Sequence, residues 1–435
     1  MEDLIITQRS NIEYIADAVR NKIGTTELLT LRQIAESIAD IESGGSVSSS
    51  SVVEKDVNFY DYDGTLLYSY TVEEANAMTT LPALPARDGL ICQGWNWSLD
   101  DIKTHNRAVN IGAIYATDDG TTRVYIHLVD GRTSPCLGLG VNGTVTVDWG
   151  DGTTLSVLTG TDVATVVWTS NHEYANAGDY VIRLTVSGAA SIIGAYEFSR
   201  LLRRSSDDAD NTNYAYASAI RRAEIGSNVT IGRYAFSRCC NLEAISIPNS
   251  ATNVGSDTFV HCYNLNFVSI PTSMTSISLQ MFGNCTGLSA VAIPTSVTEI
   301  DSSAFSSCEC LETIIIPNSV TSINSGAFSY CSSLSYIDIP DLVTHISSSL
   351  FNSCRSLSFI AFPASVNTVD SSAFSNCYAI RFYDFSNHTA VPTLSSTTTF
   401  KNMATDCEIR VPTALYDEWI AAANWSTYAA NIVAV

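Results

Sequence analysis

The stretch "SVTSINSGAFSYCSSLSYIDIP", residues 319–340, recurs through the second half of the chain and decides its fold. Its Phe returns every 23 residues without a slip, at Phe236, Phe259, Phe282, Phe305, Phe328, Phe351 and Phe374. A Cys follows each Phe after three residues and a Leu or Ile after six, and a short apolar run that often ends in Ile-Pro comes next. Apolar residues at fixed offsets in a strict period predict a solenoid, in which each coil buries these side chains against its neighbours.

This repeat closely resembles the BspA-like leucine-rich repeat, over residues 223–385. The ending "DCEIRVPTALYDEWIAAANWSTYAANIV" breaks the period and is similar to the C-termini of BspA-like proteins. It predicts a strand and an amphipathic helix, with Trp419 and Trp425, that close the open end of the stack. We therefore predict a solenoid over residues 191–400 and a C-terminal cap over 401–435.

The first 45 residues predict a short helical hairpin. Ile12, Ile15 and Val19 fall at helical spacing, and Ile34 and Ile38 resume it after "GTTE". Two helices this short bury too little apolar area to be stable alone, so their faces are expected to meet another chain or a neighbouring domain. A Ser/Gly linker, residues 46–52, follows.

Two β modules are predicted between the linker and the repeats. Residues 53–110 contain short β-like runs, many turns and aromatics that we expect to be exposed ("ICQGWNWSLDDIK"). Residues 111–190 alternate apolar and polar positions between Gly/Asp turns, as in an antiparallel sandwich. Within them, "GTVTVDWGDGTT" and "HEYANAGDYVIRLTVSG" resemble the polycystic-kidney-disease (PKD) domain, an immunoglobulin-like module. The predicted fold is thus multidomain and mainly β.

Composition excludes several kinds of partner. The 435 residues carry a formal charge of −22, which repels nucleic acid and anionic membrane surfaces. No apolar run approaches the roughly 18 residues that a membrane helix needs. The start "MEDLIITQRSNIEYIADAVR" lacks the apolar core of a secretory signal, so we expect the chain to be released into the cytosol of the cell that makes it.

One stretch suggests an enzyme. "VNFYDYDGTLLYSY", residues 57–70, resembles the nucleophile loop of haloacid-dehalogenase-type hydrolases, which would make Asp61 the nucleophile and Asp63 the acid. That chemistry needs a doubly wound parallel sheet and a downstream Lys, yet only Lys103 and Lys401 follow, and a β-like run replaces the expected helix. The pattern favours a hairpin turn at Asp63, so no catalytic residue is assigned.

No metal or cofactor site is predicted either. Asp148 and Asp151 flank a Gly turn, but the further carboxylates of a calcium loop are missing. The seven repeat Cys form one column, where an odd number gives no unique pairing, so we expect buried thiols. Cys239-Cys240 and Cys308-x-Cys310 have no partners at zinc spacing, and the six His are scattered.

A candidate binding site emerges from the outward positions of the repeat strands. Two residues after the Leu or Ile, the last three repeats carry Tyr336, Phe359 and Phe382, which coil stacking should bring into one aromatic ladder about 4.8 Å per step. Its expected flanking charges are Asp338, Asp384 and Arg381. Such a ladder suits sugar rings or a protein partner. The alternative is that the cap or another domain covers it.

Resemblance also suggests a setting. The N-terminal hairpin looks like the opening of many phage tail and baseplate proteins of Gram-positive hosts, and the module after the linker looks like one found in the same proteins. This resemblance implies a non-enzymatic virion tail protein, assembled in the host bacterial cytoplasm. Its N-terminal helices would attach to other tail proteins, its repeats would contact a host surface protein or glycan, and it would be a homo-oligomer, possibly a trimer. The alternatives are a bacterial cell-surface adhesin and, less favoured, a phosphatase.

Overall fold

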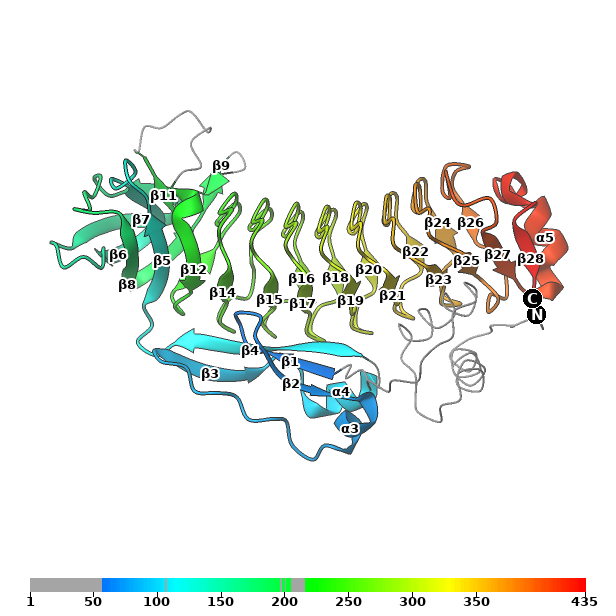
Figure 1. Ribbon diagram of the computed structural model, residues 1–435, viewed down its shortest axis with the longest axis horizontal. Helices are drawn as coiled ribbons and strands as arrows, with labels where there is room; N and C mark the ends of the chain where they lie inside the picture. Colours follow the sequence, from blue (N-terminus) through cyan, green and yellow to red (C-terminus); the bar gives the residue numbers. More distant parts are fainter. Residues whose placement is uncertain (1–56, 106–107, 196–197, 200, 205–215) are drawn as a thin grey trace.

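A computed structural model describes residues 57–435, except 106–107, 196–197, 200 and 205–215. The predicted helical hairpin and linker therefore lie outside the described residues. The described chain is mainly β, and its largest part is a row of stacked coils (Figure 1). We number the coils 1 to 7 by their Phe residues, from Phe236 to Phe374.

Each coil contributes a short strand to one long row, because the same position of each strand, from Ile245 to Tyr383, buries an apolar side chain in the core. This first strand row consists of β14 (Ala244–Ser246), β15 (Phe267–Ser269), β17 (Ala290–Ala292), β19 (Thr313–Ile314), β21 (Tyr336–Ile337), β23 (Phe359–Ala361) and β25 (Phe382–Asp384). A second strand row consists of β16 (Ser276–Ile277), β18 (Glu299–Ile300), β20 (Ser322–Ile323), β22 (His345–Ile346), β24 (Thr368–Val369) and β26 (Thr393–Leu394). Pairing within both rows is parallel, as between Phe267 and Ala290.

The repeat Phe side chains form a continuous stack inside the solenoid. Rings of successive coils lie between 5.3 Å (Phe282 to Phe305) and 5.9 Å (Phe236 to Phe259) apart, and all seven are fully buried. Phe400 continues the stack at 5.7 Å from Phe374, although it follows after 26 residues and lies outside the strict period. The predicted solenoid is confirmed, and it extends one coil beyond the seven regular repeats.

The region before the repeats is antiparallel and shares a sheet with coil 1. Its strands are β5 (Thr122–Leu128), β6 (Cys136–Asp148), β7 (Ser156–Trp168) and β8 (Gly178–Ile192), with short β9 (Gly194–Ala195), β10 (Phe198–Ser199) and β11 (Leu202–Arg203). After the helical turn η1 (Ala217–Ala219), β12 (Ile220–Glu224) pairs with both β5 and β14, and β13 (Val229–Ile231) pairs with β8. The strands predicted as a sandwich and those of the solenoid thus hydrogen-bond directly. The PKD resemblance stays a prediction.

The chain before β5 forms a separate small sheet with two helices. It contains β1 (Val57–Tyr60), β2 (Leu66–Tyr70), α3 (Val72–Ala77), β3 (Leu90–Trp95), α4 (Leu99–His105) and β4 (Val109–Thr117), and its strand order is β2-β1-β4-β3. We call these residues the docked module, because they lie along the solenoid below coils 1 to 4 in Figure 1. Our expectation of exposed aromatics was wrong for Trp97, which is buried with 2% of its surface exposed.

The C-terminal segment contains the strand and the helix that the sequence predicts. It consists of β27 (Glu408–Val411), η2 (Thr413–Leu415), α5 (Tyr416–Ala421), η3 (Trp425–Tyr428) and β28 (Ile432–Ala434). β27 pairs with β25 and so extends the first strand row. Trp419 and Trp425 are fully buried, and the Trp425 ring lies 5.4 Å from Phe385 and 5.8 Å from Phe400. The segment therefore covers the last coil.

Candidate functional site

The first strand row is covered by the docked module over coils 1 to 4. Strand β4 runs along this row in the direction opposite to the numbering of the coils. In coil 1 the Tyr115 carbonyl accepts a hydrogen bond from the Ser246 hydroxyl at 3.0 Å. Earlier on the strand, Gly112 lies against Ser269 of coil 2 and Ala292 of coil 3. Ile315, in coil 4, packs against the module's apolar cluster. A Cβ on Gly112 would lie only 1.9 Å from the Ser269 hydroxyl, so backbone contacts the solenoid directly.

Two side chains anchor the module. The Asn96 amide donates to the carbonyls of Ile270 (3.2 Å) and Ala292 (2.9 Å), and the Trp97 indole donates to Ile293 at 2.8 Å. Sequence reasoning missed both residues. One signal in the sequence could have indicated a covered surface, because the outward-pointing residues of coils 1 and 3 are small. They are Ala244 and Ser246 in coil 1, and Ala290 and Ala292 in coil 3.

Beyond the module, the row carries the predicted aromatic ladder. The Tyr336 ring lies 5.6 Å from Phe359 at an interplanar angle of 48°, and Phe359 lies 5.3 Å from Phe382 at 17°. All three side chains are half-buried. The guanidinium of Arg410, on β27, lies 4.0 Å over the Phe382 ring, a contact that sequence reasoning missed because Arg410 lies outside the repeats. The structure thus brings the three aromatics together.

The expected flanking charges do not form one set. Arg381 is exposed and lies 3.8 Å from Asp406, and Asp338 is half-buried. Asp384 differs from the expectation, because it is 4% exposed and accepts from the Ser386 amide at 2.9 Å. Burial raises the pKa of Asp384, although bonds from Ser386 and the charge of Arg410 oppose the shift. Asp384 is therefore part of the packing, and is not a ligand-facing carboxylate.

This burial gives a prediction for pH. The pKa of Asp384 is higher in the folded state than in the unfolded state, because ionising the buried carboxyl is unfavourable. The folded protein therefore has its full stability below the unfolded pKa and loses stability as pH rises through the folded pKa. Asp384→Asn cannot ionise, and we expect its melting temperature to exceed that of wild type by more at pH 7 than at pH 4. The exposed Asp130→Asn is the matched control for the substitution itself. A gain for Asp384→Asn that grows toward pH 4 would contradict the assignment.

The repeat Cys are thiols in one buried column, and six of them make the same hydrogen bond. Each thiol from Cys262 to Cys377 donates to the carbonyl of the Phe one coil earlier, as Cys285 does to Phe259 at 3.0 Å. Burial raises the pKa of these thiols, that of Cys331 to about 12. The column therefore stabilises contacts between coils, and its thiols are not nucleophiles at neutral pH.

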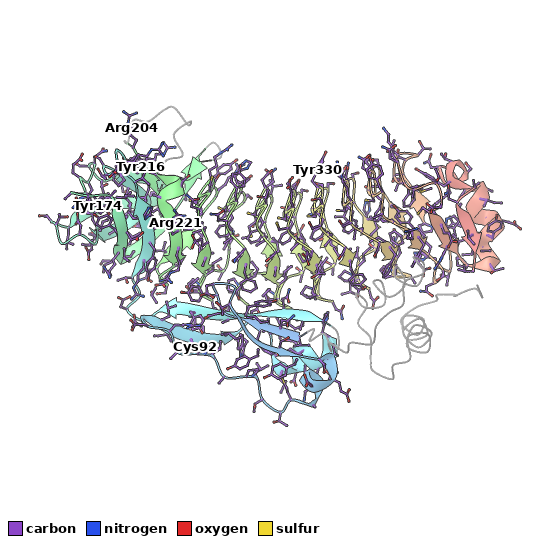
Figure 2. All side chains as sticks on the ribbon, viewed as in Figure 1. Cys92, Tyr174, Arg204, Tyr216, Arg221 and Tyr330 are labelled. Atoms are coloured by element: carbon purple, nitrogen blue, oxygen red, sulfur yellow. The ribbon has the colours of Figure 1, made fainter. Side chains whose placement is uncertain are left out.

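Thiol labelling should report this directly. Of the twelve Cys, Cys92 and Cys310 are exposed and Cys240 is half-buried, and Figure 2 shows Cys92 on the docked module. We expect a small aromatic disulfide reagent at pH 8 to label two thiols of the native protein quickly, a third slowly, and the other nine only after unfolding. The Cys92→Ser/Cys310→Ser variant should lose the fast phase. Fast labelling of five or more native thiols would refute the buried column.

The stretch that resembles a phosphatase loop forms a hairpin turn between β1 and β2. The carboxylate of Asp61 is fully buried, accepts from the Tyr62 amide at 2.8 Å and from the Arg87 guanidinium, and Asp63 accepts from the Thr65 amide at 3.0 Å. Antiparallel β2 follows where the enzyme family has a helix. The two carboxylates therefore stabilise the turn.

The second carboxylate pair also has structural partners. Asp148 accepts from the Gly150 amide at 2.9 Å, and Asp151 lies 2.8 Å from the ring of His172, which stacks on Trp149 at 4.5 Å. Within the described ranges, no group of three or more Cys, His, Asp or Glu is placed to hold a metal. Nor does any helix of the described chain have the length and apolar character needed to cross a membrane.

Comparison with known proteins identifies the repeats. The family model for the BspA type leucine-rich repeat region matches six copies, over residues 209–335, 252–381 and 281–407. The solenoid is built from BspA-type leucine-rich repeats. These leucine-rich repeats are the part of the chain that the family model covers, and no curated protein matches the chain.

Three solved structures are similar to the chain at the level of the fold alone. A leucine-rich repeat protein of T. pallidum is 22% identical over 43% of this chain and 83% of its own, with a TM-score of 0.34. One from Bacteroides ovatus is 20% identical over 50% and 68%, with a TM-score of 0.36. A leucine-rich cell surface protein of Faecalibacterium prausnitzii is 21% identical over 45% and 73%, with a TM-score of 0.26.

Proposed function

We propose that this chain is a non-enzymatic adhesive protein that binds a partner through its leucine-rich repeats. The observation that carries the proposal is the ladder of Tyr336, Phe359 and Phe382 on the first strand row. The same row already holds a protein module on coils 1 to 4 by buried contacts. The ladder continues this binding face over coils 5 to 7 with larger apolar side chains, which favour association by burying area.

The biological setting has two candidates. A bacterial cell-surface adhesin is favoured, because the repeat type supports a repeat-based binding role. A phage tail protein is the second candidate, with attachment to other tail proteins, a homo-oligomeric state and assembly in the host cytoplasm. It rests on resemblances of the sequence before residue 110, of which residues 1–56 lie outside the described ones. Antibodies against the chain should label the bacterial envelope in the first case and phage particles in the second.

The binding role is tested with the full-length fluorescent protein on a panel of gut-type Gram-positive cells. We expect the Tyr336→Ser/Phe359→Ser/Phe382→Ser variant to lose at least tenfold in cell binding, because three contact side chains are truncated. The matched control replaces three exposed tyrosines elsewhere on the solenoid, Tyr263, Tyr330 and Tyr378, by Ser and should bind as wild type.

Stability measurements separate binding from packing. The half-buried ladder rings contribute some stability, so a melting temperature a few degrees lower is expected. The single variant Tyr336→Ser, at the end of the ladder, should fold as wild type and still bind more weakly. If the triple variant binds cells as well as wild type, the ladder is not the binding surface.

A further inference from the structure

The orientation of the ladder rings determines which class of ligand they can take. We infer that the ladder binds a protein segment with aliphatic side chains and a Lys or Arg near Tyr336, and does not bind a glycan. This inference rests on the proposed function and specifies the ligand of the same surface. Three observations carry it: the use of the ring faces, the way the docked module binds the same row, and the local charge.

The rings of Phe359 and Phe382 already have a neighbour on each side. Phe359 lies between Tyr336 at 5.6 Å and Phe382 at 5.3 Å. Phe382 has Phe359 on one side and the Arg410 guanidinium, at 4.0 Å, on the other. A sugar ring packs its C–H surface flat against an aromatic face, and these faces are used by stacking along the solenoid. What the ladder presents outward is a strip of ring edges, which suits aliphatic side chains.

The docked module shows how this row binds protein. Its Asn96 and Trp97 donate to strand-end carbonyls, those of Ile270, Ala292 and Ile293. Ile339 and Phe362 occupy the same repeat positions as Ile270 and Ile293, three repeats or 69 residues later in the chain. The backbone pattern therefore continues past the module, and the outward side chains, which are small in coils 1 and 3, become a run of three aromatics in coils 5 to 7. A partner over the ladder stands further from the strands and fills the extra space with its own side chains.

Charge specifies one end of the partner. From residue 239 to residue 354 the sequence has no Lys or Arg, and its eight acidic residues are Glu243, Asp257, Glu299, Asp301, Glu309, Glu312, Asp338 and Asp341. Asp338 follows Tyr336 on the same outward face, and exposed Asp341 follows in the next turn. A cationic side chain of the partner at this end is favoured by the local negative field.

The first test treats the cells before adding the full-length protein. Shaving the cells with a protease should reduce the ladder-dependent binding at least tenfold, whereas oxidising their glycans with periodate should change it less than twofold. Binding that periodate abolishes, with or without an effect of protease, overturns the inference in favour of a glycan. If intact cells show no ladder-dependent binding at all, the proposed function itself fails.

The second test identifies what occupies the ladder. Phe359 is replaced by the photoreactive p-benzoylphenylalanine in the full chain, which is bound to intact cells and irradiated. Cross-linking to a cell-surface polypeptide that protease shaving removes supports the inference. Cross-linking only within the chain, to residues 1–56, or only to a second copy overturns it, because the ladder is then covered by the protein itself.

The third test addresses the charge. Asp338→Asn/Asp341→Asn should weaken cell binding about three- to tenfold at low salt and reduce its salt dependence. Glu243→Gln/Glu299→Gln removes the same charge from the same cation-free stretch, from exposed residues before β14 and on β18, outside coils 5 to 7, and is expected to bind as wild type. Equal effects of the two double variants would show that only the overall charge matters and would remove the cation from the inferred partner.

Discussion

Replacing Phe328 by Ala is expected to lower the free energy of unfolding of the solenoid by about 3 to 5 kcal/mol, the cost of truncating a buried Phe. The Phe328 ring is fully buried, 5.5 Å from Phe305 and 5.8 Å from Phe351 in the stack. The cavity left behind cannot be filled locally, because both neighbouring coils are fixed by their own ladders of hydrogen bonds. In a solenoid each coil contacts only its neighbours, so a weakened coil 5 reduces the coupling between the unfolding of coils 1 to 4 and that of coils 6 and 7.

Denaturant unfolding followed by circular dichroism measures this effect. We expect a lower midpoint and a second transition, because the two halves of the stack uncouple. The matched control is Tyr330→Ala, two residues away in the same coil. Tyr330 is 54% exposed and lies on the edge of the solenoid opposite the docked module, as Figure 2 shows, so its loss should stay within about 0.5 kcal/mol. A loss below about 1 kcal/mol for Phe328→Ala would mean that the ring stack is not a stabilising core.

Asn96→Ala is expected to destabilise the contact between the docked module and the solenoid by about 2 kcal/mol, at roughly 1 kcal/mol for each of the two hydrogen bonds that cross it. Asn96 is 1% exposed, donates to Ile270 and Ala292, and accepts from the Gly112 amide at 2.7 Å. Removing the amide leaves the backbone carbonyls of Ile270 and Ala292 and the backbone amide of Gly112 without this hydrogen-bond partner. The effect should be confined to the interface, because the stack of Phe rings does not involve Asn96.

Hydrogen exchange of the full chain measures that prediction locally. Protection should fall along β4 and around Trp97, while the amides of coils 5 to 7 exchange as in wild type. The control Asn264→Ala removes an exposed side chain that makes a single 3.4 Å bond to Asn241 and should leave exchange unchanged. Unchanged protection of β4 in Asn96→Ala would show that the module is held by its apolar contacts alone.

The sequence by itself determined the solenoid, its inward columns and the contiguity of the ladder. These features depend on contacts between residues one period apart, so a strict spacing of Phe, Cys and Leu specifies them without knowledge of the rest of the chain. Tyr336, Phe359 and Phe382 are neighbours for the same reason, since each is 23 residues from the next.

Tertiary structure alone decided what covers the solenoid faces. The docking of β4 on coils 1 to 4, the sheet shared by β12 and β5, and the seating of Arg410 over Phe382 all join segments of different pattern, for which no spacing rule exists. Ala292 and Ser269 were visible as small outward residues, but only the position of Gly112 shows why they are small. Asp384 was expected beside the ladder as an accessible carboxylate, and it is buried. The period predicts only which way its side chain points. Strand β27 of the C-terminal segment pairs with β25 and has no period, and it determines whether water still reaches the carboxylate.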